Sequence, residues 1–284
     1  MKAVRKHLIC LLSLVLALLL LAACGKSSQP EPTAPAPSLE PEPAQEAVEE
    51  PAPEAAPEPE PAAVQETPES RAAALGLPTP PDVDIKSWEF LVANYYNSIH
   101  EYIPQYGGIE GQGFEARAVD MAQAFLDGAR AAGYQMYAAV AYRNFEYNLT
   151  YYTEQVRELG SAAAAAAQNG TLFHAPGVNE HQTGLAMDIT DNSLYNGTYS
   201  KFSNEGILDS PTYAWAVEHC AEYGFILRYP EGKEAYYGAS CMPGHFRYVG
   251  VEAAAYIMEN DLCLEEFLLL YDENAVYLPP ELKS

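Results

Sequence analysis

The stretch NEHQTGLAMDIT, residues 179–190, decides the fold because a histidine, a glycine turn and an apolar strand follow one another in it. Leu185 to Thr190 is expected to form a strand, and Asp188 lies on it. Gly184 permits a tight return of the chain and so brings His181 toward Asp188. Such a pair suits a metal ion, although a histidine near a glycine is more commonly an ordinary loop or core residue.

A second histidine opens another expected strand. In GHFRYV, residues 244–249, His245 stands directly before the strand predicted at Phe246 to Val249. With His181 and Asp188 it would complete three protein ligands. Three ligands and one open position are the usual arrangement of a catalytic zinc ion.

The remaining patterns indicate helices mixed with short strands. Ser210-Pro211 is a typical helix start, with serine as the N-cap and proline at the first helical position. The sequence predicts an α+β fold with a small, mostly antiparallel sheet, flanking helices and a zinc site at the sheet's edge. Helices are expected at 115–132, 146–167, 210–224, 251–259 and 263–271, strands at 136–142 and 225–229, and an entry helix or loop at 86–104.

Residues 1–24 are typical of an export signal. A basic start precedes the apolar run from Leu8 to Leu21, which at 14 residues is short for a membrane-spanning helix. The run ends in LAAC, residues 21–24, which resembles the lipobox of bacterial lipoproteins. We therefore expect acylation of Cys24 and an extracytoplasmic, membrane-anchored protein. An ordinary cleaved signal with an incidental cysteine is the alternative.

Residues 25–80 are rich in proline, glutamate and alanine. Fifteen of the 22 prolines fall between Pro30 and Pro81, and eleven glutamates lie between Glu31 and Glu69. This composition predicts a disordered, extended linker, followed by one folded domain at 81–284. The net charge of −24 gives no basic footprint, which argues against nucleic-acid binding. We expect a monomer.

The domain retains Cys220, Cys241 and Cys263. Outside the membrane they could form one disulfide and leave one free thiol, and the sequence does not choose the pair.

Several separated motifs, in order, resemble the VanY-type D-alanyl-D-alanine carboxypeptidases, zinc peptidases of the peptidoglycan. The family carries Ser-x-His-x-x-Gly-x-Ala-x-Asp, matched at residues 179–188, and a late Glu-Pro-Trp-His-x-Arg-Tyr-Val-Gly, matched at 242–250. AEYGFILRYP, at 221–230, looks like the family's helix-to-strand segment, and Tyr142-Arg143 looks like its Ser-Gly-Tyr-Arg-Ser element. The likeness covers about residues 88–271.

The resemblance implies a role for each matching position. It makes His181, Asp188 and His245 the zinc ligands. It makes Arg143 the group that grips the free carboxylate of a peptidoglycan stem peptide, as a guanidinium fork suits a carboxylate. Asn144 and Asn179 occupy neighbouring positions of the substrate site, whereas His174 and His219 are not expected to be ligands.

One departure from the family concerns the reaction itself. The family's general-base glutamate stands three residues before the last histidine, where this chain has Met242, and a thioether cannot take a proton. A slip of the preceding loop could bring Glu231 or Glu234 to the site, with Glu234 as a weak catalytic candidate. Other motif positions differ as well: Gly244 replaces the tryptophan and Asn179 a serine, and the Ser-Gly-Tyr-Arg-Ser element reads Val-Ala-Tyr-Arg-Asn at residues 140–144.

Three functions remain open at this stage. The first is a zinc carboxypeptidase that removes terminal D-alanine from pentapeptide or tetrapeptide stems. The second is a wall-peptide-binding lipoprotein of the same fold that has weak or no catalysis. The third is a structural lipoprotein without a metal.

Overall fold

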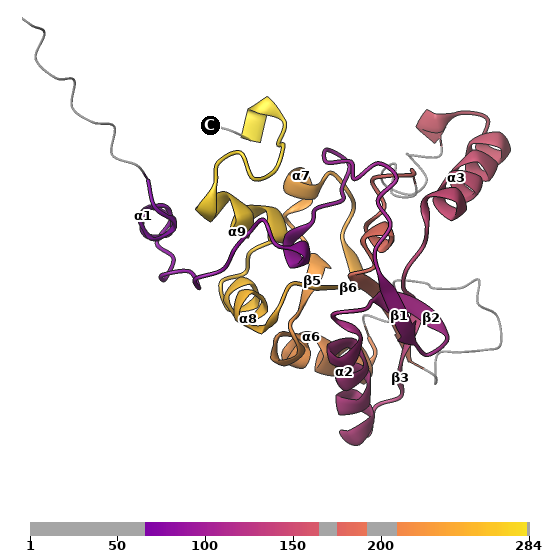
Figure 1. The fold of residues 1–284 in the computed structure, drawn as a ribbon, viewed down its shortest axis with the longest axis horizontal. Coiled ribbons are helices and arrows are strands. Elements are labelled where there is room, and N and C mark those ends of the chain that lie inside the picture. Colours follow the sequence, from indigo (N-terminus) through magenta and orange to yellow (C-terminus); the bar gives the residue numbers. More distant parts are fainter. Residues whose placement is uncertain (1–65, 165–174, 192–208, 283–284) are drawn as a thin grey trace, which may run out of the picture. The chain divides into compact units, whose positions relative to one another are not determined.

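The computed structural model describes residues 66–164, 175–191 and 209–282. Its centre is a four-stranded antiparallel sheet in the order β3-β4-β6-β5 (Figure 1). A separate hairpin pairs β1 with β2. The α+β fold expected from the sequence is confirmed. The strands are β1 (Tyr106–Ile109), β2 (Gln112–Glu115), β3 (Met136–Val140), β4 (Ala186–Asp191), β5 (Phe225–Tyr229) and β6 (Met242–Tyr248).

Helices surround the sheet in Figure 1. Among the described residues, no helix has the length and apolar character needed to cross a membrane. The α-helices are α1 (Pro68–Ala74), α2 (Val119–Ala131), α3 (Phe145–Leu159), α6 (Pro211–His219), α7 (Glu234–Tyr237), α8 (Val251–Glu259) and α9 (Leu264–Tyr271). Short 3-10 helices are η1 (Trp88–Phe90), η2 (Glu180–Thr183), η4 (Cys220–Tyr223) and η5 (Pro280–Leu282).

One face of the sheet is apolar. Because side chains alternate along a strand, Met187 on β4, Phe246 on β6 and Leu227 on β5 share this face, and their backbones pair in register. Phe125 of α2 packs at its middle, with ring centroids 5.2 Å from Phe225 and 5.6 Å from Phe246. Burial of this aromatic core fixes α2 and α6 against the sheet.

The opposite face carries polar and charged side chains, most of which are nevertheless buried. Asp188 on β4 and His245 on β6 are directly paired, so both project from this face. Arg247 and Arg228 extend it toward β5, and both are fully buried. The same residues that complete the sheet therefore bring two of the expected ligands together.

Two strand irregularities flank the paired residues Asp188 and His245. The register shifts between Ala138 and Val140 of β3, opposite Asp188, and again in β6 between Met242 and Phe246. The Gln112 side chain closes the first bulge by donating to the Ala138 carbonyl at 2.9 Å and accepting from the Ala141 amide at 2.8 Å. Bulges of this kind re-aim the side chains that follow them.

Several element boundaries differ from those expected. Helix α2 begins at Val119 instead of 115 because residues 112–115 belong to the β-hairpin, which the periodicity missed. Helix α3 ends at Gly160, whose φ of 82° is left-handed, whereas the sequence extended it through an alanine run to 167. Residues 165–167 lie outside the described part of the chain. Within 86–104 the regular element is the single turn η1.

The packed unit also begins earlier than residue 81. Helix α1 lies inside the segment assigned to the linker, with a Thr67 capping box at its start. Its Ala72 is fully buried in a second apolar cluster with Phe267 and other residues of α8 and α9. The expected signal peptide, its Cys24 and residues 25–65 lie outside the described residues.

The three cysteines of the domain are free thiols. Burial raises the pKa of Cys220 to about 12 and that of Cys263 well above its usual range. The disulfide that the sequence allowed is therefore not formed among Cys220, Cys241 and Cys263.

We predict that Phe125→Ala lowers the free energy of unfolding by about 3–5 kcal/mol, because it opens a cavity among four aromatic rings. Urea unfolding followed by circular dichroism measures this. Ile103→Ala is the control, since Ile103 is 71% exposed and should change stability by less than about 0.5 kcal/mol. Equal effects of the two variants would contradict the assigned core.

Candidate metal centre

The three expected ligands meet at one point. Each of His181, Asp188 and His245 offers one ligand atom, and these atoms all lie within 4.8 Å of one another. His181 comes from η2, whereas Asp188 and His245 come from the paired strands β4 and β6. The two imidazole rings are nearly perpendicular, with centroids 4.7 Å apart.

The turn after His181 requires glycine. Gly184 has a φ of 74°, and its amide donates to the His181 carbonyl at 3.2 Å. A Cβ at this position would lie 3.0 Å from the Pro104 side chain and 3.3 Å from the Glu115 amide. The tight return expected from the sequence is therefore confirmed, and both backbone strain and lack of space demand glycine there.

Asp188 lies between the two imidazoles. Its Oδ2 is 3.2 Å from His181 Nε2, and its Oδ1 is 2.7 Å from His245 Nδ1. Burial disfavours the charged carboxylate, but the neighbouring histidines outweigh this effect and hold the pKa of Asp188 well below its usual value. Burial lowers the pKa of His181 and so favours the neutral ring that a metal requires.

A fourth residue, which sequence reasoning missed, joins this group. The Oε2 of Glu180 lies 3.1 Å from His245 Nε2, on the side of the ring away from Asp188. Burial alone would lower the pKa of His245, but its hydrogen bonds to Asp188 and Glu180 raise it overall.

Glu180 belongs to a fully buried charge network. Its Oε1 accepts from Arg228 Nε at 2.6 Å and from Arg247 Nη1 at 2.7 Å. Arg228 also forms a bidentate pair with Glu265 of α9, at 2.6 and 2.9 Å. Two positive and two negative charges thus cancel inside the protein, and the two guanidinium groups hold the pKa of Glu180 well below its usual range despite burial. Arginines inside the otherwise apolar segments FILRY and HFRYV were the available sign of such a partner.

The donor set fits zinc. Two imidazole nitrogens and one carboxylate are typical ligands of a catalytic zinc site, whereas calcium and magnesium prefer oxygen ligands throughout. His181 Nδ1 is also buried without a hydrogen-bond partner in the described part of the chain.

Arg143 lies close to the centre on a different segment. Its backbone amide donates to the His181 carbonyl at 3.2 Å, and its guanidinium lies 5.3 Å from the centre of the Tyr147 ring. The side chain is half-buried, and the positive charge disfavours protonation of His181. No carboxylate of the described residues forms an ion pair with it.

The two asparagines expected in the substrate site have local structural contacts. The Asn144 side chain caps α3 by accepting from the Tyr147 amide at 2.8 Å. Asn179 is buried, accepts from the His181 amide at 3.0 Å, and donates to Asn148 at 3.2 Å. The Asn179 bond fixes that residue beside His181, whereas the Asn144 bond lies within its own helix, and direct contact of either with a substrate stays a prediction.

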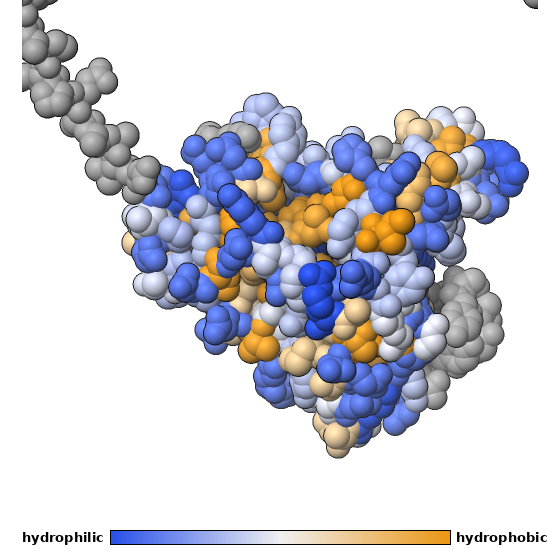
Figure 2. Space-filling view, in the orientation of Figure 1, coloured by the Kyte–Doolittle hydropathy of each residue, from blue (hydrophilic) through white to orange (hydrophobic). Residues whose placement is uncertain are grey.

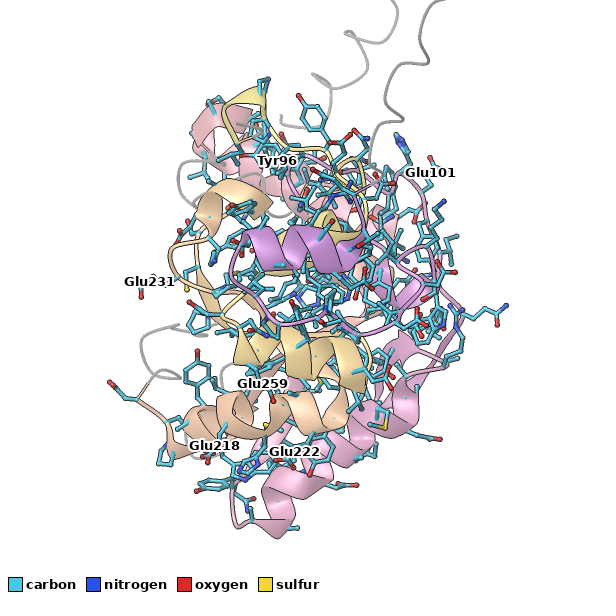
Figure 3. The ribbon with its side chains drawn as sticks, turned by 90° about the vertical axis from the view of Figure 1, so that its left-hand side faces the viewer. Tyr96, Glu101, Glu218, Glu222, Glu231 and Glu259 are labelled. Carbon is cyan, nitrogen blue, oxygen red and sulfur yellow. The ribbon has the colours of Figure 1, made fainter. Side chains whose placement is uncertain are left out.

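Met242 stands at the first position of β6, where its side chain packs against the cluster of Tyr229 and Tyr237. Glu234 begins α7 and accepts from the Gly232 amide at 3.2 Å. Burial and the charge of Glu234 both raise the pKa of Cys241. Glu234 therefore lies near Cys241, the residue before Met242. Glu231 is exposed and lies at the outer edge of the molecule (Figure 3).

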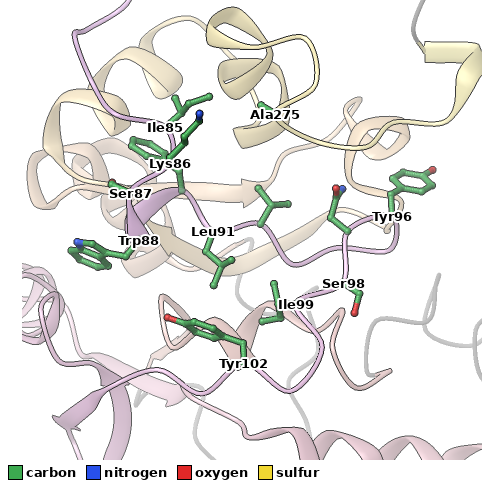
Figure 4. Close-up of a pocket in the computed structure, with 13 residues that line it drawn as sticks. Ile85, Lys86, Ser87, Trp88, Leu91, Tyr96, Ser98, Ile99, Tyr102 and Ala275 are labelled. Atoms are coloured by element: carbon green, nitrogen blue, oxygen red, sulfur yellow. The ribbon is translucent and has the colours of Figure 1, made fainter.

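The space-filling view shows apolar side chains gathering in a hollow near the centre of one face (Figure 2). A cavity of about 780 Å³ is lined by residues from 85–102 together with Ala275. Leu91, Ile99 and Tyr102 face one another across it (Figure 4). None of the three expected ligands lines this cavity.

The family model described as VanY, D-alanyl-D-alanine carboxypeptidase, matches residues 112–251. The D-alanyl-D-alanine carboxypeptidase of Enterococcus faecalis (strain ATCC 700802 / V583) is 34% identical over 191 residues, which are 65% of this chain and 67% of that protein. The chain belongs to the VanY family of carboxypeptidases.

Solved structures of peptidases are also similar to this chain. The vancomycin-resistance D,D-pentapeptidase VanY of the VanB-type cassette, a glutamate-to-alanine mutant in complex with Zn(II), is 35% identical with a TM-score of 0.53. The similarity covers 64% of this chain and 99% of that one. The LD-carboxypeptidase LdcB is 30% identical with a TM-score of 0.51, over 65% of this chain and 87% of its own. Both peptidase types thus occur among the structural neighbours.

We predict that His181→Ala weakens zinc binding by more than about 100-fold, because loss of an outer partner alone typically costs 10–100-fold. Competition with a chelator of known zinc affinity measures the change. His219→Ala is the control, since His219 contacts Glu222 and Trp215 and takes no part in the cluster. Unchanged zinc affinity in His181→Ala would place the metal elsewhere.

Proposed function

We propose that the chain is a zinc-dependent carboxypeptidase that removes terminal D-alanine from peptidoglycan stem peptides. The observation that carries this proposal is the position of Arg143. Its guanidinium has no ion pair among the described residues, and its backbone is bonded to the residue that supplies the first ligand. A cation beside a zinc site selects a peptide whose free carboxylate lies next to the bond to be cut.

In the proposed reaction the metal, its ligands and Arg143 have separate roles. Zinc, when bound, supplies Lewis-acid polarisation of a peptide carbonyl and acidifies a water molecule. His181, Asp188 and His245 hold it. Arg143 binds the terminal carboxylate in a bidentate manner and so places the last peptide bond at the centre.

The proton transfer is where this chain departs from its family. The Met242 thioether accepts no proton, and Glu180 is engaged by two arginines and a histidine. General acid–base catalysis typically contributes about 10²–10⁴-fold, so the proposed hydrolysis is slow compared with that of a member carrying the glutamate.

A second function has a specific observation in its favour. Met242 leaves the binding residues in place while it removes the base, which suits a lipoprotein that binds wall peptides without cutting them. The expected lipid at Cys24, an extracytoplasmic location and a monomeric state belong to both proposals, and peptidoglycan-acting relatives support the location.

Met242→Glu should raise the rate of D-alanine release by about 10²–10⁴-fold, because it restores a base three residues before His245. Release of D-alanine is measured with zinc-loaded protein from two synthetic substrates. The pentapeptide stem reports D,D activity and the tetrapeptide stem reports L,D activity. Met242→Gln is the matched control, similar in size but unable to take a proton. Release by neither the natural chain nor Met242→Glu would favour binding without hydrolysis.

Arg143→Gln should weaken binding of a stem peptide by about 10- to 150-fold, the range of a charge-assisted hydrogen bond of about 1.5–3 kcal/mol. Isothermal titration with a peptide and its C-terminal amide measures this. The natural chain should prefer the free carboxylate, and the variant should lose that preference. Arg157→Gln, at the exposed end of α3, serves as control. An unchanged preference in Arg143→Gln would remove its assigned role.

A further inference from the structure

We propose that Glu180 is a positioning residue that keeps the proton of the His245 ring on Nε2 and thereby presents Nδ1 as the metal-binding atom. This inference rests on the metal site of the proposed function and is independent of hydrolysis. It assigns a role to the buried charge network that joins the site to α9.

The orientation of the ring follows from its two neighbours. Nδ1 lies 2.7 Å from Asp188, itself an expected ligand, and Nε2 lies 3.1 Å from Glu180 on the opposite side. Turning the ring by 180° about its Cβ–Cγ bond would place carbon atoms at both positions. Since His245 is 1% exposed, water could not replace either lost contact.

The direction of the hydrogen bond follows from the partners of Glu180. One oxygen accepts from Arg228 and Arg247, which leaves Oε2 for His245. A carboxylate paired with two guanidinium groups has no proton to donate, so His245 Nε2 must be the donor. A neutral imidazole has one N–H, and its lone pair is then on Nδ1, the nitrogen that faces Asp188.

The network keeps Glu180 from turning away. Arg228 is anchored on its other side by the bidentate pair with Glu265, and Glu265 also accepts from Asn94 at 2.6 Å. Arg247 is anchored by the Glu89 and Leu91 carbonyls, at 2.7 and 2.8 Å. Carboxylate partners of this kind orient a ligating histidine and make it a stronger donor.

The first test uses the natural protein. We would label it with ¹⁵N-histidine, load it with zinc, and record long-range ¹H–¹⁵N correlations of the ring nitrogens. The expected signature for His245 is a protonated Nε2 and a metal-shifted Nδ1. The reverse assignment, or no zinc binding at all, would overturn the inference.

The second test compares two matched variants. In Glu180→Gln the amide oxygen is held by the two arginines, so its NH₂ group faces His245 and moves the ring proton to Nδ1. Zinc affinity should fall about 10–100-fold. Glu265→Gln removes the same charge from the same buried network but does not touch the histidine, so its zinc affinity should change by less than about threefold. Equal losses in both variants would make Glu180 merely structural.

The outcomes separate this inference from the proposed function. If Glu180→Gln does not fold, the spectrum of the natural protein still decides the tautomer. A protein with the expected tautomer that releases no D-alanine would count against the hydrolase and leave the role of Glu180 intact. A protein that releases D-alanine but binds the metal through His245 Nε2 would support the hydrolase and refute the role of Glu180.

Discussion

The rest of the structure depends on one buried carboxylate. Glu180 accepts from Arg228 on β5, from Arg247 on β6 and from the ring of His245, all without solvent. A buried ion network is costly to leave incomplete, since removing one partner typically costs about 3–5 kcal/mol. The position of η2 relative to the sheet is therefore tightly specified, and with it the position of His181, the next residue along the chain.

The two faces of the sheet have different roles. The aromatic core around Phe125 stabilises the fold from one side, whereas the other side holds the Asp188–His245 pair and the arginines. Strand alternation makes this division possible within a single layer, because neighbouring residues of one strand face opposite ways. The bulges on β3 and β6 then interrupt the alternation beside Asp188 and His245. They allow segments such as 141–143 to approach the site from the strand ends.

Membership of the VanY family and the loss of its base residue concern different parts of the site. The three expected ligands come from η2, β4 and β6, and Arg143 follows the end of β3. The charge network also involves β5 and α9. Met242 stands at the start of β6, where the family resemblance puts a glutamate, and its side chain packs against the cluster of Tyr229 and Tyr237. The residues expected to hold a metal and the position expected to carry the base are thus separate in this fold.

The sequence by itself predicted most of the strands and helices between Met136 and Tyr271 and the turn at Gly184, because each depends on local periodicity or on a short motif. It also nominated the three expected ligands, which the fold brings together and whose binding of zinc stays a prediction. It could not determine the hairpin at 106–115, where glycines obscure the alternation, or the packing of α1, whose composition is that of a linker. The sequence also could not predict the partners of Glu180. They lie 48 to 67 residues away along the chain, and only the antiparallel pairing of β5 and β6 brings their charges together.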